Sequence, residues 1–431
     1  MKKSILGGLF VAMSLSISAQ SGTNSPYSQY GLGVLTDQSQ GFNRGMNGVG
    51  LGLRMGDVVN TLNPASYSAV DSLTMIFDVG LSGQITNFKE GGKSLNARNS
   101  DFEYAVGQFR VMKGLGVSFG VLPYSNVGYE YEAKSYLNTE VGTITQTYSG
   151  SGGLHQLFLG AGWRVMKPLS VGFNVAYLWG TYNRSVVSSG SSTINSLTKK
   201  YEATVRNYNL SFGLQWDQPL SKGDHLTLGA TMGLGHNLNA DPSCSIINHN
   251  TATSVSDTTL HVVTNGLSLP MSYGVGAAWY HGEKWVLAAD MTLQKWGSQD
   301  YPAYDDNTDT YTLRSGLLKD RTKVNVGFDY VPSAMSVKFL NRVHYRFGVG
   351  YATPYYIING QDGPKELSVS AGFGVPLWTV GWNRKGNMRP VLNISAQWAH
   401  SSAKDLITEN TFRLNLGLTF NERWFAKWRI D

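Results

Sequence analysis

Most of the chain beyond residue 72 alternates apolar residues with small or polar ones at a period of two. In one such segment Leu115, Val117 and Phe119 share a face, and Gly116 and Ser118 share the other. The pattern recurs about fourteen times, and a period of two is typical of β-strands whose two faces meet different environments. The sequence therefore predicts an all-β fold of about fourteen strands.

The environment of the apolar faces follows from what lies opposite them. A soluble sandwich places many charges on its outward face, whereas here the second face is mostly Gly, Ser, Thr and Asn. The 50 Gly, 23 Tyr and 11 Trp, against 15% charged residues, are typical of a membrane barrel with interfacial aromatics. We therefore expect a transmembrane antiparallel β-barrel with its apolar faces toward lipid and its polar faces toward the lumen.

The connections between the expected strands alternate strictly between short and long. Outer-membrane barrels keep short turns on the periplasmic side and long loops outside, with an even number of strands. We predict that topology here. The short turns lie at 113–114, 167–168 and 281–284, and the long polar connections at about 123–152, 184–203, 238–267 and 297–318.

The first residues have the three parts of a cleavable secretory signal. Lys2 and Lys3 precede an apolar run, Ile5–Ile17, which ends in small residues at Ala19. We expect residues 1–19 to be removed and the protein to reside in the outer membrane of a Gram-negative bacterium. The lone Cys244 cannot form an intramolecular disulfide, and the net charge of +6 comes from scattered basic residues that give no reason to expect nucleic acid as a partner.

Three segments complete the expected organisation. Residues 20–71 lack sustained alternation but are rich in glycine, and a fourteen-stranded barrel has a lumen that its wall side chains cannot fill. This segment is the predicted plug, and 72–420 is the predicted barrel. Residues 421–431 carry Trp424, Phe425 and Trp428. We expect this periplasmic tail to form an amphipathic turn at the membrane interface or a docking site for a periplasmic partner.

The plug resembles that of the FadL family of outer-membrane transporters for hydrophobic compounds. The resemblance rests on Tyr30–Gly33, on Gly45–Gly52 and on the run NTLNPASY at 60–67, with Asn63, Pro64 and Ala65 at its centre. It covers the plug closely and the barrel in layout only. It implies an N-terminal hatch inside a fourteen-stranded barrel, capture of a hydrophobic molecule outside, and passive release sideways through a gap made by a kinked strand.

Asn63, Pro64 and Ala65 also have a purely structural interpretation. Proline fixes its own φ and restrains the residue before it to an extended conformation. The tripeptide therefore predicts a rigid corner where the plug turns into the wall, and such a corner requires no ligand.

The segment 102–112 breaks its alternation. Phe102, Tyr104 and Val106 are in one phase and Phe109 and Val111 in the other, as a β-bulge requires. We take Tyr104, Val106, Gly107 and Phe109 as the candidate lateral opening; the alternatives are an ordinary bulge and a wrongly assigned register. The alternation also places five polar residues on the lumen face of their strands. They either fill the lumen as ion pairs or contact a ligand carboxylate: Asp78, Asp290, Asp329, His344 and Arg346.

Signals for enzymatic chemistry are weak. Gly116–Gly120 matches G-x-S-x-G, but the serine lies mid-strand and no helix follows. Asp305, Asn307 and Asp309 begin like a calcium loop that lacks its glycine and glutamate. The histidines near Cys244 fit no zinc spacing: His236, His249 and His261. We expect no enzyme activity, no cofactor and no metal centre.

Two functions are compatible with the sequence. The first is passive uptake of small, fatty-acid-like hydrophobic molecules by a FadL-like route, with outer-membrane lipid and those molecules as partners. The second is an accessory scaffold barrel in a larger outer-membrane complex, for protein secretion or outer-membrane protein assembly, with other outer-membrane or periplasmic proteins as partners. The strongly polar segments 188–200 and 305–311 give little support to a capture surface for hydrophobic ligands.

Overall fold

The structure, a computed structural model, describes residues 22–72, 74–138, 142–190, 195–221, 223–377 and 390–423. The expected signal peptide and the tail residues Trp424, Phe425 and Trp428 lie outside these ranges. No helix within them is long and apolar enough to cross a membrane.

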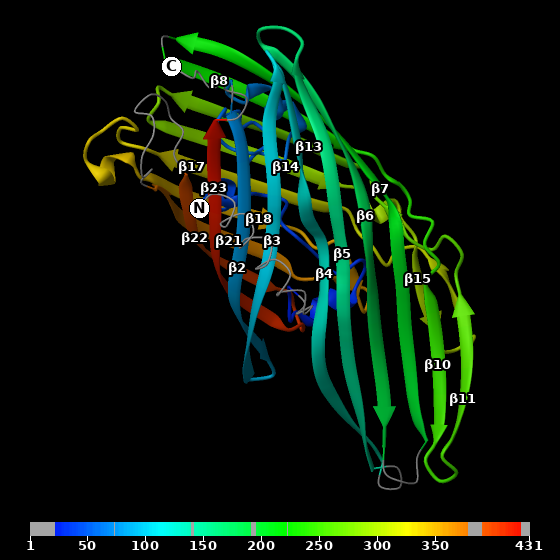
Figure 1. Cartoon of the computed structure of the whole chain (residues 1–431). Coiled ribbons are helices and arrows are strands. Elements are labelled where there is room, and N and C mark those ends of the chain that lie inside the picture. Colours follow the sequence, from blue (N-terminus) through cyan, green and yellow to red (C-terminus); the bar gives the residue numbers. More distant parts are fainter. Residues whose placement is uncertain are drawn as a thin grey trace, which may run out of the picture.

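Fourteen antiparallel strands of the described chain close into a barrel, which confirms the predicted fold class and strand number (Figure 1). The first strand pairs with the last from Thr74↔Arg423 to Lys89↔Thr408. The wall strands are β2 (Thr74–Glu90), β3 (Lys93–Met112), β4 (Leu115–Asn138), β5 (Gly142–Arg164), β6 (Leu169–Ser189), β7 (Ser196–Ser221), β8 (Asp224–Gly233), β13 (Ser272–His281), β14 (Trp285–Gln294), β17 (Arg321–Tyr330), β18 (His344–Ala352), β21 (Lys365–Pro376), β22 (Val391–Ser402) and β23 (Thr408–Arg423).

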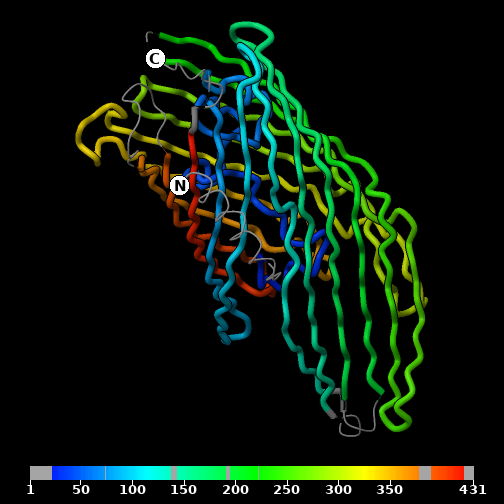
Figure 2. The backbone as a smooth tube through the Cα atoms, in the orientation of Figure 1, coloured from blue at the N-terminus to red at the C-terminus, as the bar shows by residue number. Residues whose placement is uncertain are grey.

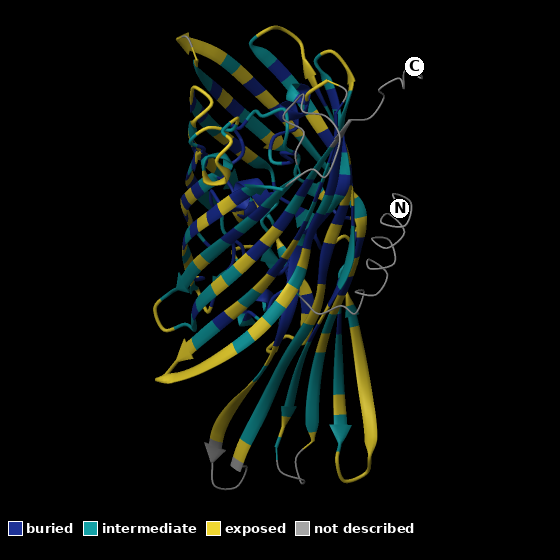
Figure 3. Ribbon diagram, turned by 60° about the vertical axis from the view of Figure 1, so that its left-hand side comes forward, coloured by how far each residue is buried: buried dark blue, intermediate teal, exposed yellow. Residues whose placement is uncertain are grey.

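Strand β6 shows how the alternating sequence becomes a membrane wall. Phe173, Val175 and Tyr177 point outward and are about half exposed, whereas Ala176 and Leu178 point inward and are buried. The outward apolar run spans residues 171–179, which matches the nine to eleven residues that cross a bilayer core. Beyond it the outward face becomes polar. Burial alternates in the same way along the other wall strands (Figure 3).

The two ends of the barrel differ in their connections. We call the end with the tight turns at 113–114, 165–168 and 282–284 the short-turn end, which in outer-membrane barrels faces the periplasm. The opposite, extracellular end is the long-loop end. Outward aromatic side chains lie near the short-turn end, as expected for a membrane interface: Trp163, Trp216, Trp285, Tyr330 and Tyr345.

The segment of residues 22–72 lies inside the barrel (Figure 2). It contains the short elements η1 (Pro26–Gln29), β1 (Val34–Leu35), α2 (Gly41–Arg44) and η2 (Pro64–Ala69). Most of its residues are buried, including Phe42, Met46 and Tyr67. The hydrogen bonds and packing described below attach it to strands around the whole wall.

The prediction of loops at 123–152 and 184–203 is wrong, because nearly all the described residues of these ranges lie in paired strands. β4 and β5 stay paired to Asn138↔Gly142, and β6 and β7 to Ser188↔Leu197. The strands therefore run past the lipid-facing zone, and Figure 1 shows β4, β5, β6 and β7 as long strands that project beyond the rest of the barrel. Two further strands, β10 (Ser243–Asn250) and β11 (Val255–Val262), join this sheet beside β7.

We call this sheet the extension; it comprises residues 128–138, 142–151, 181–189 and 196–204 together with β10 and β11. Three glycines lie at its base: Gly152, Gly153 and Gly180 are neighbours across β5 and β6 and have φ of +112°, +144° and +153°. Glycine adopts these values far more readily than other residues.

The remaining loops hold small ladders and helices. These are β9 (His236–Asn237) with β12 (Ser268–Leu269), η3 (Trp296–Ser298), β15 (Tyr301–Asp305) with β16 (Thr310–Arg314), and β19 (Ile357–Ile358) with β20 (Gln361–Asp362). The predicted strict order of short and long connections does not hold. The β2–β3 turn at the long-loop end is only Gly91–Gly92, whereas the β17–β18 connection at the short-turn end spans 331–343 and contains η4 (Phe339–Arg342).

Two substitutions on one face of β6 test where the membrane ends. Val175→Arg places a cation in the middle of the lipid-facing run and should destabilise the barrel by about 2–4 kcal/mol. Asn183→Arg, on the same face of the extension, should change stability by less than about 0.5 kcal/mol. Urea unfolding in lipid vesicles measures both, and equal losses would show that the extension is also embedded.

Candidate functional site

The corner at Asn63 anchors the plug to the wall. The Asn63 side chain accepts a hydrogen bond from the Ala65 backbone N–H at 3.1 Å and so caps η2. Its amide donates to the carbonyl oxygens of Leu51 at 2.8 Å and Leu214 at 3.2 Å. Pro64 is the first residue of η2, where a missing N–H costs nothing. The corner thus joins two parts of the plug to β7.

Inward-facing glycines of the wall make room for this corner. A Cβ on Gly172 would overlap the Pro64 carbonyl group, and a Cβ on Gly162 would overlap the Pro64 oxygen. Gly213 lies equally close to the Asn63 side chain. These glycines belong to three adjacent strands, β5, β6 and β7. We call the surface that they form against the plug backbone the glycine floor.

A buried ion pair holds the plug to the opposite wall. Arg44 of α2 lies 2.8 Å from Glu103 of β3, with side chains only 4% and 7% exposed. Arg44 also donates to Asn415 of β23 at 3.0 Å, and Glu103 accepts from Ser82 of β2. These hydrogen bonds and the opposite charge of the partner offset the cost of removing each charged side chain from water.

A second charged residue of the plug, Asp37, faces Lys323 of β17 at 3.7 Å. Burial raises the pKa of the Asp37 carboxyl, but the cations of Lys323 and Arg44 outweigh that effect and hold the pKa below its usual value. Asp37 is therefore a carboxylate at neutral pH.

The five polar residues selected by parity all face the lumen, but they do not form one network. Asp329, His344 and Arg346 make a triad, with Asp329 to His344 at 2.9 Å and to Arg346 at 3.2 Å. Asp290 accepts from the backbone N–H groups of Gly50 at 2.6 Å and Leu51 at 2.8 Å, so it holds the plug. The fifth residue, Asp78, accepts from Tyr104 and Thr419.

The structure has a β-bulge in β3, but not between Val106 and Phe109, where the sequence changes phase: pairing with β2 is regular from Tyr104 to Phe109, and Phe102 and Tyr104 lie on opposite faces. Gly80 pairs with Tyr104 and Leu81 with Phe102, so that Glu103 is the extra residue. Phe102 consequently points outward, whereas Glu103 and Tyr104 are buried. The bulge turns Glu103 toward the lumen, where it reaches Arg44. Regular alternation of the sequence would place Glu103 on the outer face, so the sequence did not identify it as a site residue.

The candidate lateral opening lies beside a separation of two wall strands. Val106, Gly107 and Phe109 of β3 are paired with β2 and with β4. Pairing with β4 stops at Ala105↔Val121, and β3 from Lys93 to Tyr104 pairs with β2 alone. Only Tyr104 among the four candidates therefore borders the separation, and its hydroxyl is bonded to Gly41 of the plug at 2.6 Å.

The N-terminal part of the plug occupies this separation. Asn24 donates to the Arg98 carbonyl of β3 at 3.2 Å, and Gln84 of β2 donates to the Gly22 carbonyl. On the other side the Ser28 hydroxyl and Gly128 of β4 exchange hydrogen bonds. The same segment thus bridges the two strands that have parted.

Aromatic side chains pack together above the plug at the long-loop end. Tyr30 stacks on Tyr356 at 5.4 Å, and Trp296 packs on Tyr355 at 4.8 Å. Arg184 is buried among them and donates to the Gly31 carbonyl at 2.6 Å. Other members of the cluster come from the plug, the extension and β15: Tyr27, Tyr129, Tyr131, Tyr148, Tyr182 and Tyr301. This cluster packs over the plug at the long-loop end of the barrel.

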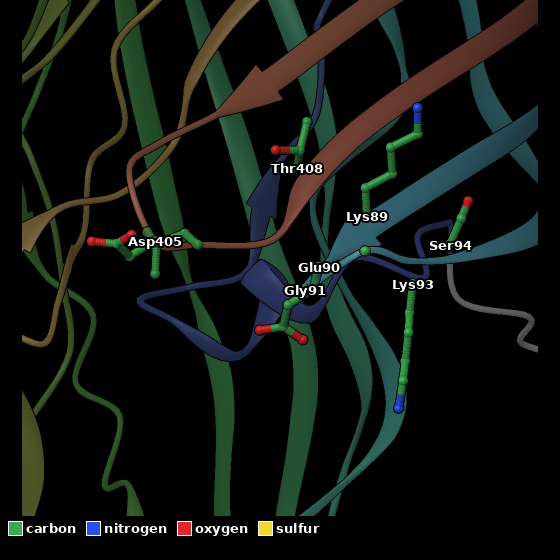
Figure 4. Close-up of a pocket in the computed structure, with 9 residues that line it drawn as sticks. Lys89, Glu90, Gly91, Lys93, Ser94, Asp405 and Thr408 are labelled. Atoms are coloured by element: carbon green, nitrogen blue, oxygen red, sulfur yellow. The ribbon is translucent and has the colours of Figure 1, made fainter.

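Two hollows in the described part of the chain lie at the surface of the long-loop end and carry mostly polar linings. One lies between the β2–β3 turn and the β22–β23 loop, where the side chains of Lys89, Lys93, Glu90 and Asp405 diverge (Figure 4). The other is lined by residues 202–204, 239–241 and Ser243. Neither hollow has the apolar lining of a site for a hydrophobic molecule.

The weak chemical motifs have structural roles. Ser118 lies mid-strand in β4 and donates to the Gly107 carbonyl at 3.0 Å. Asp305 caps its own turn by accepting from the Asn307 N–H and also pairs with Arg314. Cys244 is buried opposite His261. The described residues contain no group of three or more His, Cys, Asp or Glu that could hold a metal ion.

The architecture defines the class: an outer-membrane-type barrel with the fold of FadL-like transporters. A Pseudomonas aeruginosa FadL homologue is similar with a TM-score of 0.63 and 11% identity, over 90% of this chain and 99% of that one. The Ralstonia pickettii toluene transporter TbuX gives 0.61 and 14%, over 89% and 98%. The P. putida toluene transporter TodX gives 0.58 and 15%, over 92% and 99%.

The sequence places the chain more narrowly. The BamG family model matches residues 1–431, so the protein belongs to the BamG family. No curated protein matches it. The FadL-like resemblance expected from the plug is confirmed at the level of the fold.

A substitution in the glycine floor tests whether plug and wall interlock. Gly172→Val should force the plug away from β6 and destabilise the protein by about 1–3 kcal/mol, as overpacking does. The control is Gly83→Val, because a Cβ on Gly83 meets nothing within 4 Å. The unfolding transition in detergent measures the difference, and limited proteolysis of the plug should rise in the first variant only.

Removal of one partner of the buried ion pair tests the plug anchor. Arg44→Ala leaves Glu103 buried and unpaired, which should cost about 3–5 kcal/mol. Lys319→Ala removes a half-exposed partner of Asp362 and should cost less than about 1 kcal/mol. Urea unfolding of both variants in one detergent gives the comparison; similar small losses would mean that the Arg44–Glu103 pair does not hold the plug.

Proposed function

We propose that this protein is a scaffold subunit of a larger outer-membrane complex, and that the extension is its docking platform for a partner protein. The observation that carries the proposal is that the strands of the extension continue beyond the lipid-facing zone. In β6 the stretch 181–189 adds roughly 25–30 Å at about 3.3 Å per residue. A barrel that served only as a membrane pore would need no such sheet.

The outer face of the extension suits a protein partner better than lipid. Its side chains are mainly hydroxyl groups, together with exposed charged residues such as Glu132, Lys134 and Glu202. The hydroxyl groups of Thr181 in β6 and Thr204 in β7 lie 3.0 Å apart and are hydrogen-bonded to each other. Further outward residues are Thr145, Thr147, Ser149, Asn183, Ser185 and Thr198.

The extension also has two strand edges that can accept another strand. Within the described chain β11 pairs with β10 alone, and Val255, Leu260 and Val262 of β11 are all more than half exposed. On the opposite side β4 beyond Gly128, which is bonded to Ser28 of the plug, has ladder pairing with β5 alone. Unprotected edges are templates for strand addition by another chain.

The interior supports the same proposal. The plug is hydrogen-bonded to the wall on several sides and the aromatic cluster packs above it, which favours a scaffold over an open pore. The family assignment agrees, since the name BamG points to the second function considered from the sequence, a subunit in outer-membrane protein assembly.

A second candidate is passive uptake of fatty-acid-like molecules by a FadL-like route. The separation of β3 and β4 supports it, together with a fold that the toluene transporters TbuX and TodX share. This route would require the segment around Gly22–Ser28 to leave the separation.

Affinity purification of the tagged protein from its native outer membrane, with mass spectrometry of co-purifying proteins and of extracted lipids, tests the proposal. We expect a stoichiometric protein partner. Two variants change the two edges of the extension: a two-residue Asn-Gly turn in place of residues 133–146, and Leu260→Lys with Val262→Lys. At least one of them should lose the partner, since lysines and shortened strands block edge pairing.

The matched control replaces residues 88–95 of the β2–β3 hairpin by the same turn, because that hairpin also projects at the long-loop end but is not part of the extension. It should retain the partner. A lone barrel carrying apolar molecules would support uptake and refute the scaffold. Retention of the partner by both edge variants would show that the extension is not the platform.

A further inference from the structure

The β17–β18 connection differs from every other described turn at the short-turn end. It spans residues 331–343, whereas the turns at 113–114, 165–168 and 282–284 have two to four residues. Figure 1 shows it projecting sideways from the barrel between β17 and β18. We call residues 332–342 the side loop.

The side loop exposes large apolar side chains. Val337 is 98% exposed, and Met335, Phe339 and Leu340 are 68%, 50% and 67% exposed. Soluble surfaces rarely gather so many exposed apolar groups in one short segment, and contiguous patches of this kind mark a protein or membrane contact.

The exposure is built into the conformation of the loop. The Ser333 N–H donates to the Asn341 carbonyl at 2.8 Å and closes the base, and the Asn341 N–H donates to the Lys338 carbonyl at 3.3 Å. Ser336 accepts from the Lys338 N–H and from the Asn341 side chain, both at 3.2 Å. Ser333, Ser336, Lys338 and Asn341 are thus hydrogen-bonded to one another within the loop, while Met335, Val337, Phe339 and Leu340 remain outside.

The side loop leans on the lipid-facing surface of the barrel. The Tyr345 hydroxyl donates to the Leu340 carbonyl at 3.1 Å. Tyr345 itself belongs to the outward aromatic belt, where its ring lies 5.8 Å from Phe373 and 6.5 Å from Tyr330. The apolar side chains of the loop therefore continue the surface that already contacts lipid, at the level where it meets the headgroups.

The charges of the loop fit the same environment. Residues 331–343 contain Lys338 and Arg342 and no acidic residue. Apolar side chains flanked by cations are typical of segments that lie in the interface, because the apolar groups enter the acyl region while the cations remain among the phosphates.

From these contacts we propose that the side loop is a membrane anchor that inserts Val337 and its apolar neighbours into the phospholipid leaflet at the short-turn end. The anchor enlarges the lipid-contacting surface on one side of the barrel, beside β17 and β18. It thereby restrains the tilt of the barrel relative to the membrane. The inference does not depend on the scaffold proposal, because it concerns contact with lipid rather than with a partner.

A single label on the side loop tests this. In a Cys244→Ser background, Val337→Cys carries an environment-sensitive fluorophore, and the full-length barrel is reconstituted into vesicles of phosphatidylethanolamine and phosphatidylglycerol. Val337 is almost fully exposed, so the label should not disturb the fold. Glu283→Cys in the polar β13–β14 turn, at the same end of the barrel, is the matched control.

We expect the label at 337 to show blue-shifted emission, quenching by lipids with spin labels high on the acyl chain, and several-fold weaker quenching by iodide than the label at 283. Equal iodide quenching at both positions would overturn the anchor. Exposure to iodide in these vesicles, with protection in native membranes that contain co-purifying proteins, would also overturn it and assign the side loop to a protein partner.

Discussion

Inside the hydrocarbon layer every backbone N–H and C=O must be paired within the protein, and the rest of this structure depends on that requirement. The β2–β23 pairing meets it by closing the sheet. Closure is needed only as far as lipid extends. Pairing of β3 with β4 ends at Ala105↔Val121, and pairing of β7 with β8 ends at Ser211↔Gly233. Beyond those levels one side of the wall becomes the extension and the other ends in loops.

The inward face of the wall is shaped by the plug more than by water. Its glycines admit the plug backbone, as Gly172 does at Pro64, and its polar residues bond to plug atoms, as Asp290 does at Gly50 and Leu51. The small and polar residues that alternate with apolar ones along each strand are therefore one half of a contact surface. The glycine-rich segment before β2 is the other half.

The sequence predicted the parts of the fold that lipid controls. Apolar alternation is strong wherever one face meets hydrocarbon, so the fourteen wall strands and the even topology could be inferred. Alternation disappears in the extension, because neither face of residues 181–189 meets lipid there, and paired strands were mistaken for loops. Glu103 was missed because a one-residue bulge reverses the face of the chain. The Asp329–Arg346 contact depends on strand register, which alternation does not specify.

The same separation of β3 and β4 bears on both candidate functions. In a transporter it would be the exit, and the chain would have to release Asn24 from Arg98 and Ser28 from Gly128 in each cycle. These bonds lie at the edge of a plug whose deeper contacts include the buried Arg44–Glu103 pair, so a local movement of the N-terminal segment need not disturb the rest. In a scaffold the separation has a different cause: β4 must leave β3 to continue into the extension, and the N-terminal segment seals the gap that this departure leaves. The second account explains the gap and the extension together, whereas the first explains the gap alone.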